Sequence, residues 1–350
     1  MSEFRIDRIK NQKGDNGPHI EGTTTFTGTS GIVLPSGDTY YRSAAGRGIL
    51  YGGYNPATPT IDSINITTLG NAIKFGNDLY NMMQMTATSS STRMVFGGGT
   101  GTSPTHCRYV QIAEAGHSLE YNDLTAERRG AAGCSDGIRG FYAGGGPGPA
   151  LDQSFAQDTI DFIVISTTGK ANDFGDLTLQ RRQMSSFGSQ TRGVYSGGYL
   201  YSGPYAAYKN VDFITYSTMG NAQEFGELSG ARAAMGGGSN STRGLIGGGI
   251  QTPTPTNTTE IDYMSIASKG NSIDFGVLSA ALHNQGVCPN STRAVFAGGY
   301  APSGGSYADT NVMEYVQFST LGDAVDFGDL STARSIGNNG ASSDSHGGLG

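Results

Sequence analysis

The side chains best suited to chemistry are few and scattered in this chain. There are five histidines and three cysteines, and the only neighbouring His–Cys pair is His106 and Cys107. A zinc site needs further ligands at defined spacings, and no second pair stands at such a spacing. We therefore interpret both residues as ordinary parts of a strand and expect no metal. The cysteines (Cys107, Cys134 and Cys288) are odd in number and far apart, so no disulfide framework is expected.

Acid–base and nucleophilic catalysis also lack a recognisable motif. No histidine stands with a serine, cysteine or acid in a known catalytic arrangement. Carboxylate pairs such as Asp173 and Asp176 recur, but their setting is typical of solvated turn residues. The glycine-rich stretches lack the Gly-Lys-Ser/Thr ending and the following helix of a phosphate-binding loop. We expect a protein without enzymatic activity and without a cofactor.

Six arginines recur at one repeated position. Each opens a short apolar run that ends in a glycine pair, as in RGVYSGG at 192–198. They are Arg47, Arg93, Arg139, Arg192, Arg243 and Arg293. A ring of such side chains could bind an anion. A residue present in every repeat more often serves the scaffold, so we expect these arginines to bind carbonyls or carboxylates of neighbouring repeats.

The arginine phrase is one of four phrases that recur in order. GNAQEFGEL at 220–228 has five near-copies, and IDFIVI at 160–165 represents another phrase. The fourth phrase is L-x-x-x-R, with Arg128, Arg181, Arg232 and Arg334 in its arginine slot. Alternation of apolar and polar residues predicts strands, and a run that ends at a glycine pair predicts a buried strand. No stretch sustains an amphipathic helix, so each unit is predicted to hold four short strands.

A period of about 50 residues with four strands per unit is typical of a β-propeller. The order of the phrases resembles the kelch repeat from residue 47 to about residue 342, although the chain has no Trp and uses Phe or Tyr in its place. The fold class is therefore all-β, with a kelch-like β-propeller over 47–350. Counting the phrases predicts six blades, the first completed by a C-terminal strand at 330–342 that closes the ring. The alternative has seven blades, with residues 20–34 adding strands to a partial last blade.

Composition narrows the range of partners. The 350 residues include 56 glycines, carry a formal net charge of −7 and contain no run rich in Lys or Arg. Nucleic acid is therefore not an expected partner. No run of about 18 apolar residues is present, so membrane insertion is not expected. The opening MSEFRIDRIKNQKGDN lacks the apolar core of a signal peptide.

The connections after the glycine pairs vary most between repeats, and function on a repeat scaffold lies in such differences. These connections are rich in Pro, Thr, Ser and Tyr and are expected to emerge on one face. Tyrosines crowd two of them, as Tyr199, Tyr201, Tyr205 and Tyr208 in one and Tyr300 and Tyr307 in another. Tyrosine suits protein or sugar surfaces. The same rings could instead pack their own loops, and the sequence leaves both interpretations open.

Residues 1–46 do not follow the repeat. They are too polar for a core of their own, and we interpret them as an arm that docks onto another protein, where strand addition could order it. RIDRIKNQKGDNGP followed by TTFTGTSGIVLPSGDT resembles the N-terminal segments of virion structural proteins from tailed phages, especially marine cyanophages. The repeat also resembles propeller repeats in such phage proteins. The resemblance implies a bacteriophage tail, tail-fibre or appendage component.

Several expectations follow from this resemblance. The protein would assemble in the host cytoplasm, reside in the virion and bind other virion proteins through residues 1–46. It would be present in multiple copies in a symmetric assembly, and its propeller would serve protein contact or host recognition. The first alternative is a carbohydrate-binding adhesin that recognises a host-surface glycan through its Tyr-rich loops. The second is a cellular kelch-type interaction adaptor.

Overall fold

The computed structural model describes residues 46–53, 58–100, 104–147, 156–200, 206–253, 256–303, 306–337 and 339–345. The chain divides into two compact units, Met1–Ser43 and Ala44–Gly350, and every described residue belongs to the second. The predicted arm lies outside the described residues except for Gly46, and so does the segment 20–34 of the seven-blade alternative.

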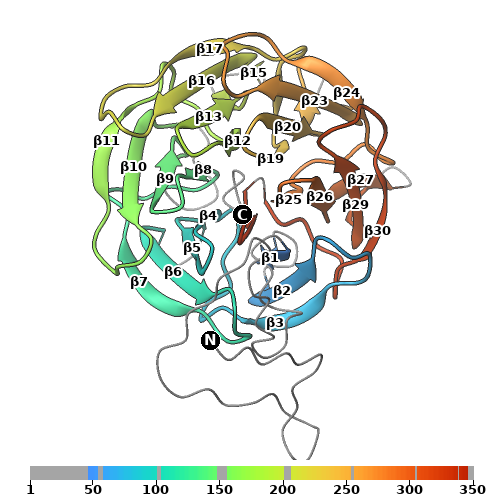
Figure 1. Cartoon of the computed structure of the whole chain (residues 1–350), viewed down its shortest axis with the longest axis horizontal. Helices are drawn as coiled ribbons and strands as arrows, with labels where there is room; N and C mark the ends of the chain where they lie inside the picture. The colour runs from blue at the N-terminus through green and yellow to red at the C-terminus, as the bar shows by residue number, and fades with distance from the viewer. Residues whose placement is uncertain are drawn as a thin grey trace, which may run out of the picture. The chain divides into compact units, whose positions relative to one another are not determined.

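The described residues form an all-β structure of 31 strands without a helix. Six four-stranded antiparallel sheets lie around a common centre, each with one strand near the centre and one at the periphery (Figure 1). This arrangement is consistent with a β-propeller-like fold. In this part of the chain no helix has the length and apolar character needed to cross a membrane.

The six sheets are numbered by chain order and given from the innermost to the outermost strand. Sheet 1 contains β31 (Ala341–Ser343), β1 (Arg47–Tyr51), β2 (Thr60–Asn65) and β3 (Ile73–Asn77). Sheet 2 contains β4 (Thr86–Ser89), β5 (Arg93–Gly97), β6 (His106–Gln111) and β7 (Leu119–Asp123). Sheet 3 contains β8 (Ala132–Ser135), β9 (Arg139–Ala143), β10 (Thr159–Val164) and β11 (Asn172–Asp176).

The remaining three sheets have the same strand order. Sheet 4 contains β12 (Ser185–Gly188), β13 (Arg192–Ser196), β16 (Asn210–Thr215) and β17 (Gln223–Glu227). Sheet 5 contains β19 (Gly236–Ser239), β20 (Arg243–Gly247), β23 (Glu260–Ser265) and β24 (Ile273–Val277). Sheet 6 contains β25 (Gly286–Pro289), β26 (Arg293–Ala297), β29 (Val312–Gln317) and β30 (Val325–Asp329).

The innermost strands begin later than the sequence predicts. The L-x-x-x-R phrase was expected to be a strand, but its residues form a crossover segment from the outermost strand of one sheet to the innermost strand of the next. The strand starts only beyond a residue with a left-handed backbone, such as Gln183 (φ 51°) or Gly337 (φ 78°). A left-handed residue interrupts an extended run. The predicted strand at 330–342 is therefore reduced to β31, Ala341–Ser343.

The end of the described chain pairs with its beginning. β31 pairs with β1 in antiparallel register, with Gly48 opposite Ser343 and Leu50 opposite Ala341. The carboxylate of Asp344 accepts a hydrogen bond from the backbone N–H of Arg47 (3.2 Å). Sheet 1 thus combines three strands from the start of the repeat region with one from its end.

Hydrophobic cores lie between neighbouring sheets. The buried residues form six clusters, each of which joins the side chains of two adjacent sheets. Phe174 of sheet 3 packs with Ile214 and Tyr216 of sheet 4, and Phe327 of sheet 6 packs with Ile64 of sheet 1. The aromatic residue of the phrase typified by GNAQEFGEL therefore fills the space between adjacent sheets.

The recurring phrase GNAQEFGEL joins outermost strands of adjacent sheets. The Asn221 side-chain oxygen accepts a hydrogen bond from the backbone N–H of Asp176 (3.1 Å), and the Gly220 N–H donates to the Phe174 carbonyl (3.0 Å). A Cβ on Gly175 would lie 2.5 Å from the Gly220 carbonyl oxygen, so this close approach requires glycine. Asn71 and Asn271 accept the equivalent hydrogen bond at two other junctions, and His117 and Asp323 accept it at two more, so the phrase is repeated because it joins neighbouring sheets.

A buried ion pair fixes four of the six crossover segments. Its arginine comes from the L-x-x-x-R phrase, and its aspartate from the third strand of the sheet that the segment enters. The pairs are Arg128–Asp161 (3.1 Å), Arg181–Asp212 (2.8 Å), Arg232–Asp262 (2.5 Å) and Arg334–Asp62 (2.9 Å). All four arginines are fully buried. In each case a Ser or Thr hydroxyl of the same segment donates to the aspartate.

The segment from sheet 1 to sheet 2 carries the same pair with its charges exchanged. Met82 occupies the arginine slot, and Arg108 of β6 occupies the aspartate slot. The buried guanidinium of Arg108 lies 3.3 Å from a carboxylate oxygen of Asp78, which stands where other segments have leucine. Tyr51 and Ser118 also donate hydrogen bonds to Asp78. This copy of the phrase has no arginine in its arginine slot, and the sequence alone gave no reason to pair Asp78 with Arg108.

The segment from sheet 5 to sheet 6 has the acid but not the arginine. Leu282 occupies the arginine slot, and Glu314 of β29 is 2 % exposed. The backbone N–H of Ser279 donates to one carboxylate oxygen (2.9 Å), while the other has no hydrogen-bond partner among the described residues. Burial raises the pKa of Glu314 because desolvation disfavours the carboxylate.

Replacing Glu314 by Gln should stabilise the protein at neutral pH. A raised pKa means that the folded state holds the proton more tightly than the unfolded state, so this group favours folding at low pH. Its contribution is lost as the pH rises from the unfolded pKa through the folded one. Urea unfolding between pH 5 and pH 8 should therefore show an advantage of Glu314→Gln that grows with pH. Asp274→Asn, at an exposed position of β24, is the control. A difference that is flat with pH would contradict the assignment.

The glycine pairs allow crossover segments to approach the second strands. Gly144 has a left-handed backbone (φ 61°), and a Cβ there would lie 2.4 Å from the Arg181 carbonyl oxygen. The next glycine, Gly145, donates its N–H to the same carbonyl (3.0 Å). The glycine pair therefore permits a close backbone approach.

Gly144→Ala is expected to destabilise the protein. Left-handed strain costs about 1–3 kcal/mol for a residue with a side chain, and the contact with a backbone carbonyl adds to this cost. Chemical denaturation of the full chain measures the change. Gly270→Ala is the matched control, because a Cβ there meets nothing within 4 Å. Equal stability of the two variants would contradict the prediction.

Candidate functional site

The six repeated arginines lie between sheets. Each donates a hydrogen bond from its guanidinium to a backbone carbonyl at the end of the third strand of the next sheet. The acceptors are Ile112 for Arg47, Ile165 for Arg93, Tyr216 for Arg139, Ile266 for Arg192, Phe318 for Arg243 and Ile66 for Arg293. Several also stack on an aromatic ring of their own sheet, as Arg93 does on Tyr109 (4.2 Å). These contacts favour the scaffold interpretation over an anion site.

Among the described residues, extra hairpins follow the glycine pairs of sheets 4, 5 and 6. They are β14 (Tyr199–Leu200) with β15 (Ala206–Ala207), β21 (Ile250–Gln251) with β22 (Thr256–Asn257), and β27 (Tyr300–Ser303) with β28 (Ser306–Asp309). A further short strand, β18 (Arg232–Ala233), pairs with β21. We call these three hairpins the hairpin crest.

Hydrogen bonds join each hairpin of the crest to the next. The backbone N–H of Ala207 donates to the Thr252 hydroxyl (3.2 Å). The Asn257 side-chain amide donates to the Tyr300 carbonyl (3.2 Å), and its oxygen lies 3.1 Å from Nδ1 of His283. The crest is therefore one connected surface over three sheets, and not three independent loops.

The predicted tyrosines have different environments. Tyr199 is 6 % exposed, and the Arg182 guanidinium lies 4.8 Å from its ring centre, so this residue packs its own loop. Tyr208 and Tyr300 are half-buried at the crest. Tyr201 and Tyr205 lie outside the described residues, as does the side chain of Tyr307 in β28. The structure thus brings Tyr199, Tyr208 and Tyr300 to one face, and only the latter two expose much of their surface.

His283 lies in the crossover segment that enters sheet 6 and contacts the crest, and the sequence did not single it out. Its ring meets the ring of Tyr300 edge-on at 5.3 Å. Burial lowers its pKa to about 4, because desolvation disfavours the imidazolium. The neutral ring therefore serves as a fixed contact between the hairpins of sheets 5 and 6 at physiological pH. Its signal in the sequence is a histidine where two of the equivalent copies have Arg129 and Arg182.

The described part of the chain offers few side chains suited to metal binding or thiol chemistry. No group of three or more His, Cys, Asp or Glu side chains there could hold a metal ion. His106 lies 3.4 Å from Asp123 at a half-exposed position, whereas its neighbour Cys107 is buried. Burial raises the pKa of all three cysteines, to about 11 for Cys134, which disfavours the reactive thiolate.

Polar side chains of the innermost strands form hydrogen bonds with neighbouring innermost strands. Ser239 exchanges hydrogen bonds with the backbone of Gly188, and Ser186 does so with Gly133. The Asn339 amide reaches the carbonyl of Met184 (2.9 Å). These side chains tie neighbouring sheets together near the centre, so they are occupied by structural hydrogen bonds.

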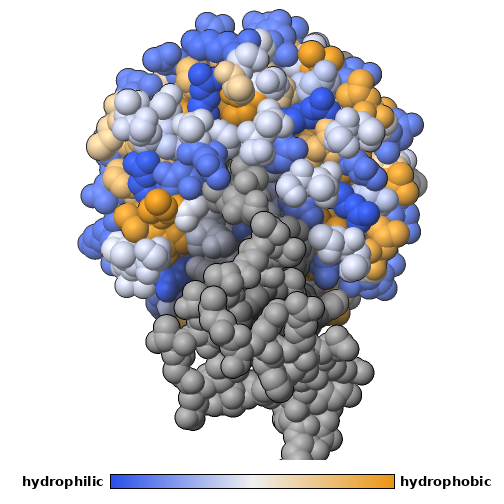
Figure 2. Space-filling view, viewed as in Figure 1, coloured by the Kyte–Doolittle hydropathy of each residue, from blue (hydrophilic) through white to orange (hydrophobic). Residues whose placement is uncertain are grey.

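Exposed apolar side chains form a second asymmetric feature. On the face shown in Figure 2, hydrophobic residues form separate patches toward the periphery, among hydrophilic ones. The outermost strands of sheets 1, 2, 5 and 6 begin with an exposed apolar residue, whereas those of sheets 3 and 4 begin with Asn172 and Gln223. We call the apolar set the outer rim. It consists of Ile73, Leu119, Ile273 and Val325, with Leu69 and Leu321 nearby in sequence.

Comparisons of the chain with models of known protein families and with curated proteins found no match. Functional assignment therefore rests on the residues and their geometry.

Proposed function

We propose that the chain is a six-bladed, kelch-like β-propeller closed by β31 on β1. Two observations support this proposal. The innermost strands contact one another in series, from β31 through β4, β8, β12, β19 and β25 and back to β31. The contacts between sheet 6 and sheet 1 are also of the same kind as those between consecutive sheets, including the ion pair of Arg334 with Asp62.

The protein then acts by contact and not by catalysis. The observation that carries this inference is that the repeated polar residues form structural contacts between sheets. The repeated arginines, aspartates, glycines and hydroxyls are engaged in junctions between sheets, and among the described residues the hairpin crest and the outer rim are surfaces on which the sheets differ. Exposed apolar patches mark contact surfaces on soluble proteins.

The particular role that we propose is that of a virion structural protein of a tailed phage, in a tail fibre or another appendage. The resemblance of the N-terminal segment supports this role. Residues 1–46 dock onto another virion protein, and the propeller presents its crest for protein contact or host-surface recognition. A rigid ring suits such a role because it fixes the relative positions of its surface loops.

Mass spectrometry of purified particles tests the virion role. Peptides of this chain should be present in particles, and a phage that encodes the chain without residues 1–46 should lose them from particles while still producing the protein in the cell. A matched phage with Gly144→Ala controls for loss through instability. Absence of the chain from wild-type particles, or equal incorporation of the truncated form, would contradict the proposal.

A further inference from the structure

One open pocket lies at the hairpin crest on sheet 5. It has a volume of about 240 Å³ and is lined by Ser229, Gly230, Ala231, Gln251, Thr252 and Glu260. One wall is the crossover segment that enters sheet 5, and the opposite wall is the hairpin β21–β22. The pairing of β18 with β21 holds the two walls together, with Arg232 opposite Gln251.

The pocket exists because Gly230 has no side chain to fill it. The equivalent positions of the other crossover segments carry side chains, namely Tyr80, Ala126, Leu179, Ala280 and Thr332. A Cβ on Gly230 would meet only the amide nitrogen of Gln251, at 3.8 Å. Gly230 has no left-handed backbone that would require glycine. The absence of a side chain at this position therefore opens space without serving a turn.

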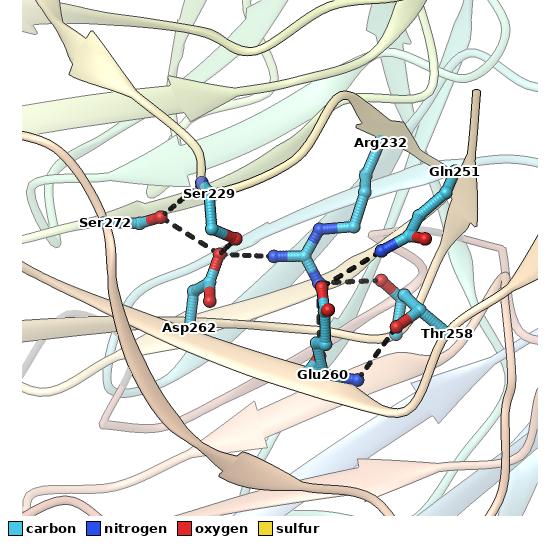
Figure 3. A network of polar contacts seen from close by, with 8 residues as sticks. Ser229, Arg232, Gln251, Thr258, Glu260, Asp262 and Ser272 are labelled. Carbon is cyan, nitrogen blue, oxygen red and sulfur yellow. Dashed lines mark hydrogen bonds and ion pairs between the residues drawn. The ribbon is translucent and has the colours of Figure 1, made fainter. Parts of the chain in front are cut away.

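The polar groups of the pocket are oriented by neighbours (Figure 3). The Gln251 amide donates to a carboxylate oxygen of Glu260 (3.0 Å), and the Glu260 backbone N–H donates to the Thr258 hydroxyl (3.2 Å). The Glu260 side chain remains 46 % exposed. A carboxylate that is held in place and still open to solvent is prepared to accept hydrogen bonds from a ligand.

Charge in the pocket favours a neutral ligand over an anionic one. The buried Arg232 lies 3.8 Å from Glu260 but 2.5 Å from Asp262. Because Asp262 already balances this guanidinium, the exposed group that faces a ligand is the carboxylate. Hydroxyl-rich molecules match the set, since a carboxylate accepts from hydroxyl groups and an amide both donates and accepts.

We propose that this pocket binds one hydroxyl-rich sugar unit of a surface polysaccharide. Its volume lies below the roughly 300–1,000 Å³ of pockets that enclose drug-sized ligands, which fits a single sugar ring at the end or side of a glycan. Glu260 accepts hydrogen bonds from sugar hydroxyls, Gln251 donates and accepts, and Gly230 gives the ring access. The proposal rests on the contact function proposed above and assigns a ligand class to one part of the crest.

The test uses the full chain on a glycan array that carries bacterial surface polysaccharides, followed by titration with the methyl glycoside of the best-binding sugar. Gly230→Leu places in the pocket the side chain that the equivalent position has at Leu179, and should weaken binding at least about tenfold. Thr332→Leu makes the same change in another crossover segment and should leave binding unchanged. Glu260→Gln keeps the shape and should also weaken binding about tenfold.

The outcomes separate this inference from the virion role. Binding by the wild type and by Thr332→Leu, with loss in both pocket variants at unchanged melting temperature, supports the sugar site. Binding to no glycan, or binding unaffected by Gly230→Leu and Glu260→Gln, overturns it. Particles that carry Gly230→Leu should contain the chain at the wild-type level, so failure of the sugar site leaves the result on virion incorporation independent.

Discussion

Asp62→Ala is expected to lower the free energy of unfolding by about 3–5 kcal/mol, the usual cost of breaking a buried ion pair by removing one partner. Asp62 is 0 % exposed in β2 and lies 2.9 Å from Arg334. It also accepts hydrogen bonds from the hydroxyl and the backbone N–H of Ser331. The substitution leaves a fully buried guanidinium without its carboxylate and frees the segment that joins sheet 6 to sheet 1.

Equilibrium denaturation with urea measures this loss, and Asp212→Ala provides the matched comparison. Asp212 makes the same contacts with Arg181 and Thr178, but it joins sheets 3 and 4, which are consecutive in the chain. Similar losses in the two variants would mean that the last junction is as firmly formed as an internal one. A loss below about 1 kcal/mol, typical of an exposed ion pair, for Asp62→Ala alone would contradict the proposed ring closure.

Arg108→Met should have an effect of the same size, about 3–5 kcal/mol, because it leaves Asp78 without its cation in a site where Asp78 is 6 % exposed. Asp78→Leu should cost a similar amount, since it leaves the guanidinium of Arg108 uncompensated. Leucine is the residue found at the equivalent position in the other five segments, so steric fit is not the expected problem.

The double variant Asp78→Leu with Arg108→Met is expected to recover most of the lost stability. Replacing a buried ion pair by apolar residues is often neutral or stabilising by about 1–4 kcal/mol. A double-mutant cycle from the four denaturation curves gives the coupling energy between the two residues. Additive losses in the double variant would show that the two side chains do not act as a pair.

Much of the fold could be predicted from the sequence because the same strand-forming phrases recur in six repeats. The phrases typified by RGVYSGG, IDFIVI and GNAQEFGEL each mark a strand, since period-two patterning and terminal glycines act locally. The L-x-x-x-R phrase was placed in a strand that begins about ten residues too early at the C-terminal copy. There the buried arginine and the left-handed Gly337 hold the chain in a crossover segment, a tertiary effect that local pattern does not report.

The candidate site was less accessible to sequence reasoning. Tyrosine content drew attention to the connections of sheets 4 and 6, which form two hairpins of the crest, but not to the hairpin of sheet 5, which contains no tyrosine. The pairing of Gln251 with Arg232 brings Glu260 and Gly230 to one pocket from positions about 30 residues apart, a spacing that depends on the sheet geometry. The pair of Asp78 and Arg108 could not be predicted either, because it also depends on the sheet geometry.

The antiparallel pairing of β31 with β1 places residues 341–343 beside residues 48–50, although they are far apart in the chain. A gene rearranged so that a peptide linker joins residue 345 to residue 46, with new ends opened in a surface turn, would encode the same set of strand neighbours. Circular permutants of this kind are tolerated where termini lie close together, which makes the crest available as a place to start or finish the chain.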